Sequence, residues 1–130
     1  MSEQTAVVHQ ICDMFRKGDI PGILGCIDPD SELVFEGPSE VPWAGTYRGR
    51  GGWSTFFERV GVNLDILGMT MDIFAAENDN VVAVGRYQAR VKHTGKTFDS
   101  PLVHLWTIRA GLVMKCHETT NTAVEAAACV

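Results

Sequence analysis

Two residues near the end of the chain, His104 and Glu118, have side chains suited to general acid–base chemistry. They lie in two alternating runs of residues between Ser100 and Thr122 that meet at Arg109-Ala110-Gly111. A glycine third in so short a connection is typical of a three-residue β-hairpin with a bulge. The sequence therefore predicts that both side chains belong to one hairpin.

The predicted register of this hairpin decides which residues share a face. It has four pairs on one face: Ile108–Leu112, Trp106–Met114, His104–Cys116 and Leu102–Glu118. That face is apolar apart from His104 and Glu118, which become diagonal neighbours about 7–8 Å apart. An imidazole exchanges protons near neutral pH, and a carboxylate in an apolar pocket can act as a base. We therefore expect the pair to be catalytic residues on a pocket wall.

Each of the two residues also has a purely structural interpretation. His104 could be a core histidine that is hydrogen-bonded to a backbone carbonyl or to Glu118. Glu118 could be a strand-end residue turned to solvent, because an unpaired carboxylate is costly to bury.

Six other side chains are candidates for binding a substrate. Trp43 and Tyr47 lie in a loop rich in proline and glycine, and we expect them to form a lid with the Tyr47 hydroxyl as a donor. Packing against the following helix is the alternative for both. The remaining candidates are expected to line the interior, although such residues are more often core than ligand contacts: Phe15, Phe56, Trp106 and Met114.

The sequence predicts neither a metal site nor a cofactor. The four histidines and four cysteines do not form the clusters that metal ligands require. The glycine-rich segment Arg48–Gly52 lacks the Lys-Ser/Thr ending of a phosphate loop. The segment Met1–Thr5 does not resemble a signal peptide, which favours the cytoplasm, and in that reducing compartment the scattered cysteines are expected to be free thiols.

Composition limits the class of protein and its partners. A chain of 130 residues with 45% hydrophobic residues can fold as one domain with its own core. A net charge of −5 argues against nucleic acid as a partner. The sequence has no apolar stretch long enough to span a bilayer, so no membrane partner is expected.

The order of predicted elements indicates an α+β domain. Helices are expected first and long strands last: helices at 5–17, 20–26 and 53–60, and strands at 32–35, 65–74, 81–92, 97–109 and 112–120. One domain is expected over residues 1–122, followed by a frayed tail or a short helical extension at 123–130. Val103, Leu105 and Val113 form an apolar stripe on the outer face of the predicted sheet, which predicts a homodimer.

Three segments of the chain resemble the SnoaL-like branch of the nuclear transport factor 2-like superfamily. These are the helix ending at Phe15-Arg16-Lys17-Gly18-Asp19, the loop Val41–Arg50 with Trp53-Ser54-Thr55-Phe56-Phe57, and the hairpin from Trp106 to Thr122. The resemblance implies a cystatin-like α+β cone, in which a curved, mostly antiparallel sheet wraps around N-terminal helices. It also implies a deep apolar pocket and a dimer. The superfamily includes isomerases, polyketide cyclases, epoxide hydrolases and proteins without catalytic activity.

The resemblance also tests individual positions against the ketosteroid isomerases of this superfamily. Their oxyanion tyrosine corresponds to Ile11, which cannot donate a hydrogen bond. Their general-base aspartate lies near Gly37, with Glu36 beside it, and their protonated acid corresponds to His104. The SnoaL-like pattern commonly ends in an aspartate where this chain has Asn121. These differences argue against steroid-type isomerisation.

Two functions follow from the sequence. The first is a cofactor-free isomerase, cyclase or hydrolase that acts on a small apolar carbonyl or polycyclic compound through His104 and Glu118. The second is a non-catalytic ligand-binding or dimerisation module with the same fold.

Overall fold

The computed structural model describes residues 2–130, which form an α+β fold. The elements follow in this order: α1 (Glu3–Arg16), α2 (Ile20–Leu24), β1 (Ile27–Phe35), β2 (Gly45–Arg48), α3 (Gly49–Asn63), β3 (Leu64–Glu77), β4 (Asn80–Val91), β5 (Thr97–Arg109), β6 (Leu112–Thr120) and α4 (Thr122–Ala128).

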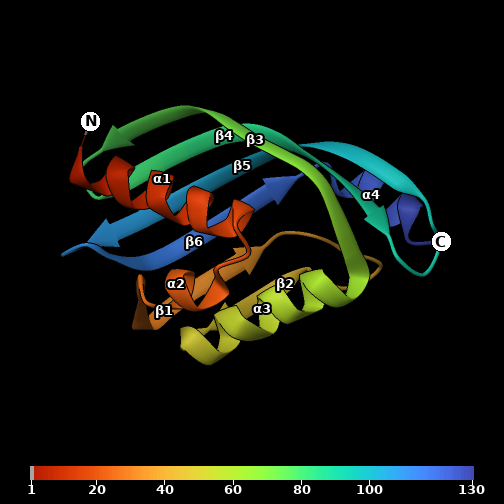
Figure 1. The fold of residues 1–130 in the computed structure, drawn as a ribbon, viewed down its shortest axis with the longest axis horizontal. Coiled ribbons are helices and arrows are strands. Elements are labelled where there is room, and N and C mark those ends of the chain that lie inside the picture. Colours follow the sequence, from red (N-terminus) through yellow and green to blue (C-terminus); the bar gives the residue numbers. More distant parts are fainter. Residues whose placement is uncertain (1) are drawn as a thin grey trace.

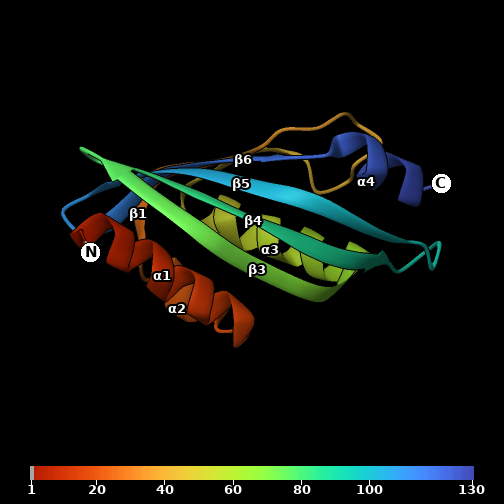
Figure 2. The same cartoon turned by 90° about the horizontal axis from the view of Figure 1, so that it is seen from above.

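All six strands belong to one curved sheet in the order β2-β1-β6-β5-β4-β3. Every neighbouring pair is antiparallel except β1 and β6, which are parallel. Figures 1 and 2 show α1, α2 and α3 packed along the strands, with α4 set apart at the end of the sheet beside the C-terminus. The predicted sheet wrapped around N-terminal helices is therefore confirmed.

The first two helices begin at side-chain caps that the sequence supplies. The Ser2 hydroxyl accepts a hydrogen bond from the Thr5 amide at the start of α1, and the Asp19 carboxylate accepts one from the Gly22 amide in α2. Gly18 separates the two helices with a left-handed φ of 71°. The buried side of α1 includes Val8 and Ile11, which pack into the core.

The long strands alternate between buried and exposed residues, as half-buried strands should. In β4 this alternation runs almost without interruption from Val81 to Val91. Gly85 allows β3 to lie very close to β4, because a Cβ there would lie 1.8 Å from the Thr70 carbonyl oxygen. This close approach lies beside a register shift between Met71 and Ile73, where the sheet curves around the helices.

The predicted register of the final hairpin is wrong. Its turn has two residues, Ala110 and Gly111, with left-handed φ values of 51° and 76°, so Arg109 pairs with Leu112. A second shift, at Met114, then places Trp106 opposite Cys116 and His104 opposite Glu118. Together the two shifts move the pairing by two residues.

The bulge also reverses the faces near the turn. Val113 is buried and pairs with Ile108, whereas the prediction placed Val113 on the outer face. Val103 is half-buried, and Leu105 remains 45% exposed on that face. The outer stripe is therefore made by β3, β4 and β5, where Ile73 and Val82 are also exposed.

Two segments contain more structure than the sequence pattern predicts. Residues 45–48 were expected in a loop, but they form the edge strand β2, which pairs with β1. Residues 122–128 form the helix α4, so the helical alternative holds over most of the expected tail. Within residues 2–130, no helix is both long enough and apolar enough to cross a membrane.

Candidate functional site

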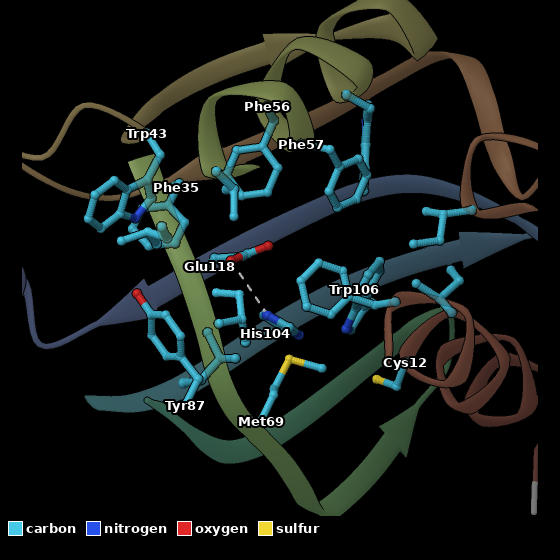
Figure 3. A pocket seen from close by; sticks show the side chains of 18 residues that line it. Cys12, Phe35, Trp43, Phe56, Phe57, Met69, Tyr87, His104, Trp106 and Glu118 are labelled. Carbon is cyan, nitrogen blue, oxygen red and sulfur yellow. Dashed lines mark ion pairs between the residues drawn. The ribbon is translucent and has the colours of Figure 1, made fainter. Parts of the chain in front are cut away.

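An apolar cavity lies between the inner face of the sheet and the helices. The volume that the centres of water molecules can occupy in it is about 80 Å³. Such a space is several times the minimum that holds one water molecule. Residues from α1, α2 and α3 form one side of the cavity, and residues from β1 and β3–β6 form the other. Figure 3 shows aromatic side chains around it, with His104 and Glu118 on its floor.

His104 and Glu118 face each other directly across β5 and β6, instead of diagonally as predicted. The His104 Nε2 atom lies 3.6 Å from a Glu118 carboxylate oxygen, and the two side chains are 9% and 12% exposed. The His104 Nδ1 atom is buried and has no hydrogen-bond partner among the described residues. The pair is thus enclosed in the pocket wall, with one imidazole nitrogen left without a hydrogen bond to the described residues.

The wall around the pair is almost entirely aromatic and aliphatic. The Trp106 ring meets the His104 ring edge-on, with 5.4 Å between their centroids. Trp53 stacks on Trp106 from α3 at 6.3 Å. All three tryptophans of the chain line the cavity, so the acid–base pair lies among large apolar side chains: Trp43, Trp53 and Trp106.

The structure brings four of the six expected substrate-binding residues to the cavity. Phe15, Phe56, Trp43 and Trp106 line it together with His104 and Glu118.

Met114 is not among the residues that line the cavity. It is the extra residue of the bulge in β6, and the shift places it away from the inner face, where Cys116 takes the position opposite Trp106. The expectation that Met114 faces the interior was therefore wrong, because it depended on an unbulged strand.

Tyr47 is buried but does not line the cavity either. Its hydroxyl donates a 2.8 Å hydrogen bond to the Trp43 carbonyl oxygen, and its ring packs edge-on against Phe56. The Tyr47 hydroxyl, expected to donate a hydrogen bond to a ligand, thus donates it to the backbone of the loop. Tyr47 therefore stabilises the segment that carries Trp43.

Two further positions suggested by the family resemblance lie differently from the isomerase pattern. Ile11 lines the cavity, where its side chain offers only apolar contact. Glu36 lies outside, where its carboxylate is 3.0 Å from His117 Nε2 and its side chain is 59% exposed. Neither residue supplies a polar group to the pocket.

The cavity also contains one thiol, Cys12 from α1. Burial raises the pKa of this thiol to about 11, so it stays protonated at neutral pH and is a poor nucleophile. Within residues 2–130, no group of three or more histidine, cysteine, aspartate or glutamate side chains is placed to hold a metal ion.

The sequence reasoning missed Tyr87 and Glu125. The Tyr87 side chain lines the cavity, and its hydroxyl donates a hydrogen bond to the carboxylate of Glu125. Glu125 belongs to α4 and is fully buried. Alternation along β4 leaves either Arg86 or Tyr87 facing inward, so that signal was present. Glu125 was hidden by the alanine-rich composition of its segment, although Asn121 before it is a good N-cap.

Comparison with known proteins decides the family. Residues 8–115 match the sequence profile of the SnoaL-like domain. The chain belongs to this family. Its fold agrees with that of an NTF2-like protein from Burkholderia pseudomallei K96243, with a TM-score of 0.91, 21% identity, and coverage of 100% of this chain and 99% of the other.

Two more relatives of this SnoaL-like protein have more specific names. TerC, whose crystal structure was determined with polyporic acid, superposes with a TM-score of 0.85 and 25% identity over 98% of each chain. Patulin synthesis protein F of Aspergillus clavatus is 36% identical over 83 residues, which are 60% of this chain and 40% of that protein. The match thus spans about two-fifths of the length of this curated relative.

Proposed function

We propose that this SnoaL-like protein binds a small, largely apolar molecule in its cavity and catalyses a cofactor-free proton transfer on it. The observation that carries the proposal is the His104–Glu118 pair, which lies 3.6 Å apart in an otherwise apolar wall. Two titratable groups in such a place are costly to bury, and acid–base work explains their presence.

The pair supplies the two roles that such a reaction needs. The Glu118 carboxylate would remove a proton from a carbon next to a carbonyl group of the substrate, and the His104 imidazole would donate a hydrogen bond or a proton to the developing oxyanion. Return of the proton to another carbon completes an isomerisation. In a ring closure, the enolate carbon would instead bond to a second carbonyl carbon of the same substrate, and the proton would go to the alkoxide oxygen formed there. The aromatic wall strengthens both interactions, because apolar side chains lower the local dielectric constant.

The shape and lining of the cavity support a planar apolar ligand that carries carbonyl groups. Aromatic rings from Trp43, Trp53, Trp106, Phe35 and Phe56 provide flat contact surfaces. A curated relative named for patulin synthesis and a structural neighbour crystallised with polyporic acid support a small organic compound as the ligand class. The four free thiols fit a reducing compartment such as the cytoplasm, where we propose that the protein acts.

A non-catalytic binding module is the second candidate. Ile11 in place of the isomerase tyrosine favours it, and so does the contact between His104 and Glu118, because the two groups can satisfy each other. In that case the cavity would capture a ligand and leave it unchanged.

The protein is also proposed to act as a homodimer through the outer face of the sheet. Ile73, Val82 and Leu105 expose 58%, 38% and 45% of their surface there, on three adjacent strands. Exposed apolar residues grouped in this way are typical of a protein interface.

Native mass spectrometry of the purified protein tests whether the cavity holds a ligand. We expect a retained small organic molecule, which denaturing extraction would identify. Met69→Trp is the matched control, because Met69 is a half-buried lining residue of β3 and an indole there would occupy the cavity. Wild-type protein that retains nothing, and that binds added polyporic acid no better than folded Met69→Trp, would contradict the proposed binding function.

A further inference from the structure

Glu125 is a fully buried carboxyl group that the proposed reaction does not use. It lies on α4, and its relative exposure is 0%. One carboxylate oxygen accepts the Tyr87 hydroxyl from β4, and the other accepts the Thr120 hydroxyl at the end of β6. A carboxyl group so deeply enclosed is retained in a fold only where its hydrogen bonds are satisfied.

The helix that carries Glu125 is fixed at both of its ends. At its N-terminus, the Asn121 side chain accepts from the Val124 amide, and the Asn121 amide donates to the Ser100 hydroxyl at 2.8 Å. At its C-terminus, the turn between β4 and β5 holds the last carbonyls, with His93 Nε2 2.8 Å from the Cys129 carbonyl oxygen and Thr94 donating to Ala128. Figure 1 shows α4 beside this turn. These contacts hold α4 in place, and with it the carboxyl group of Glu125.

Tyr87 connects Glu125 to the cavity wall. Its ring lines the cavity, and Figure 3 shows its hydroxyl turned toward Trp43. Phe98 stacks on Trp43 at 6.2 Å and meets Tyr87 edge-on at 5.3 Å, so the three rings form one packed group. A shift of the Tyr87 ring would therefore also disturb Trp43.

We propose that Glu125 is a positioning residue for the ligand pocket: by accepting the Tyr87 hydroxyl, it fixes the aromatic wall formed by Tyr87 and Trp43. In this proposal, α4 supports the wall of the binding site without contacting the ligand. The proposal deepens the proposed function, because it assigns to the same pocket the element that sets its shape.

The charges around the group agree with this role. Burial raises the pKa of Glu125, while the hydrogen bonds from Thr120 and Tyr87 oppose that rise, and Glu118 on β6 raises it further. Burial likewise raises the pKa of the Tyr87 hydroxyl, so this hydroxyl keeps its proton and remains a donor to the carboxyl group.

The first test measures binding of 2-naphthol to the full chain by isothermal titration calorimetry. Glu125→Ala removes the acceptor and is expected to weaken binding about tenfold, the effect of one lost hydrogen bond in the wall. Glu125→Gln keeps an acceptor oxygen and is expected to stay within about twofold of the wild type. Folded Glu125→Ala that binds like the wild type, or Glu125→Gln that loses as much as Glu125→Ala, would overturn the proposal.

A double-mutant cycle separates positioning from general loss of stability. Tyr87→Phe keeps the ring but removes the hydroxyl, so it is expected to weaken binding about as much as Glu125→Ala. If Glu125 acts through this hydroxyl, the double variant binds no more weakly than Tyr87→Phe alone. Additive losses would contradict this role.

A second readout needs no ligand and so remains decisive if the binding function itself fails. In proton NMR spectra, the wild type and Glu125→Gln should show a slowly exchanging Tyr87 hydroxyl proton, which Glu125→Ala should lose together with a shift of the Trp43 indole signals. Unchanged Trp43 and Tyr87 ring signals in folded Glu125→Ala would overturn the proposal, whatever the naphthol titration shows.

Discussion

At the scale of single residues, His104 and Glu118 have a place that structural packing alone does not require. Their side chains interrupt an inner face otherwise made by Leu102, Trp106 and Cys116. Apolar residues of similar volume would fill the same space without the cost of burying polar groups. In the proposed function, the pair is therefore the chemical centre of the pocket.

Substitution of Tyr47 should affect the stability of the fold more than the affinity for a ligand. Tyr47→Phe removes the 2.8 Å hydrogen bond to the Trp43 carbonyl oxygen in a buried setting, and we expect it to lower the free energy of unfolding by about 1–2 kcal/mol. Ligand affinity should change less than in Tyr87→Phe, because the Tyr47 ring does not line the cavity. Urea denaturation and calorimetry measure the two effects. A larger loss of affinity in Tyr47→Phe would show that Tyr47 belongs to the pocket.

The sequence predicts that His104 and Glu118 share one face of the hairpin, but not how the two residues pair. Alternation along both strands places His104 and Glu118 on one face under either register, because the two registers differ by two residues. Met114 shows the limit of such reasoning: a bulge is a local choice of backbone that alternating side chains do not specify. The turn was missed because Ala110 adopts a left-handed conformation that alanine rarely takes.

At the scale of elements, the sequence did not predict how α4 is held. The composition of residues 123–130 predicts a frayed tail or a short helical extension; the second alternative holds, and Glu125 docks this helix against β4 and β6. Glu125 adds its hydrogen bonds to those at the two ends of α4, and nothing in an alanine-rich pattern reveals its partners in advance. By contrast, α1 and the long strands have strong periodic patterns and were predicted within a few residues of their ends.

Asn121 caps α4, and this gives a prediction about the family's aspartate. Asn121→Ala removes the side chain that accepts from the Val124 amide, and it should lower the free energy of unfolding by about 0.5–2 kcal/mol in urea denaturation. Asn121→Asp also caps helices well, so it should match the wild type in stability and in ligand affinity. A gain of catalysis in Asn121→Asp would show instead that an acid is missing at this position.

Glu125 also makes stability depend on pH. Because burial raises the pKa of Glu125 above its usual value of 4.5, the folded protein holds this proton more tightly than the unfolded chain. The associated stabilisation is fully present below pH 4.5 and is lost as the pH rises through the raised pKa. The groups that face the carboxyl are Tyr87, Thr120 and Glu118, with Cys129 on its own helix.

The free energy of unfolding, measured by urea denaturation from pH 4 to pH 8, tests this linkage. Relative to Glu125→Gln, which cannot ionise, the wild type should lose stability as the pH rises. Parallel curves for the two proteins would mean that Glu125 titrates alike in the folded and unfolded chains.

At the scale of the whole molecule, the two faces of the sheet differ in how their apolar residues are covered. The inner face forms the core and the cavity, and the outer face leaves Leu105, Val82 and Ile73 exposed. The proposed dimer would cover the outer face while the helices enclose the inner one, so binding chemistry and assembly would use opposite sides of one sheet.

Leu105→Glu tests the proposed dimer by placing a charge in the middle of the outer face. We expect it to shift the protein from dimer to monomer in sedimentation equilibrium at micromolar concentration. Val62→Glu is the control, because Val62 is 67% exposed on α3 and lies away from that face. A wild-type protein that is monomeric, or a Leu105→Glu variant that stays dimeric, would contradict the proposed interface.

The most direct test of the proposed chemistry is deuterium exchange at the carbon next to the carbonyl group of 2-tetralone, followed by NMR in deuterated water. The wild type should accelerate exchange over buffer, and folded Glu118→Gln and His104→Gln should each lose about a hundredfold or more of that acceleration. If both folded variants exchange the probe as fast as the wild type, His104 and Glu118 are not the acid–base pair, and the cavity is a binding site without this chemistry.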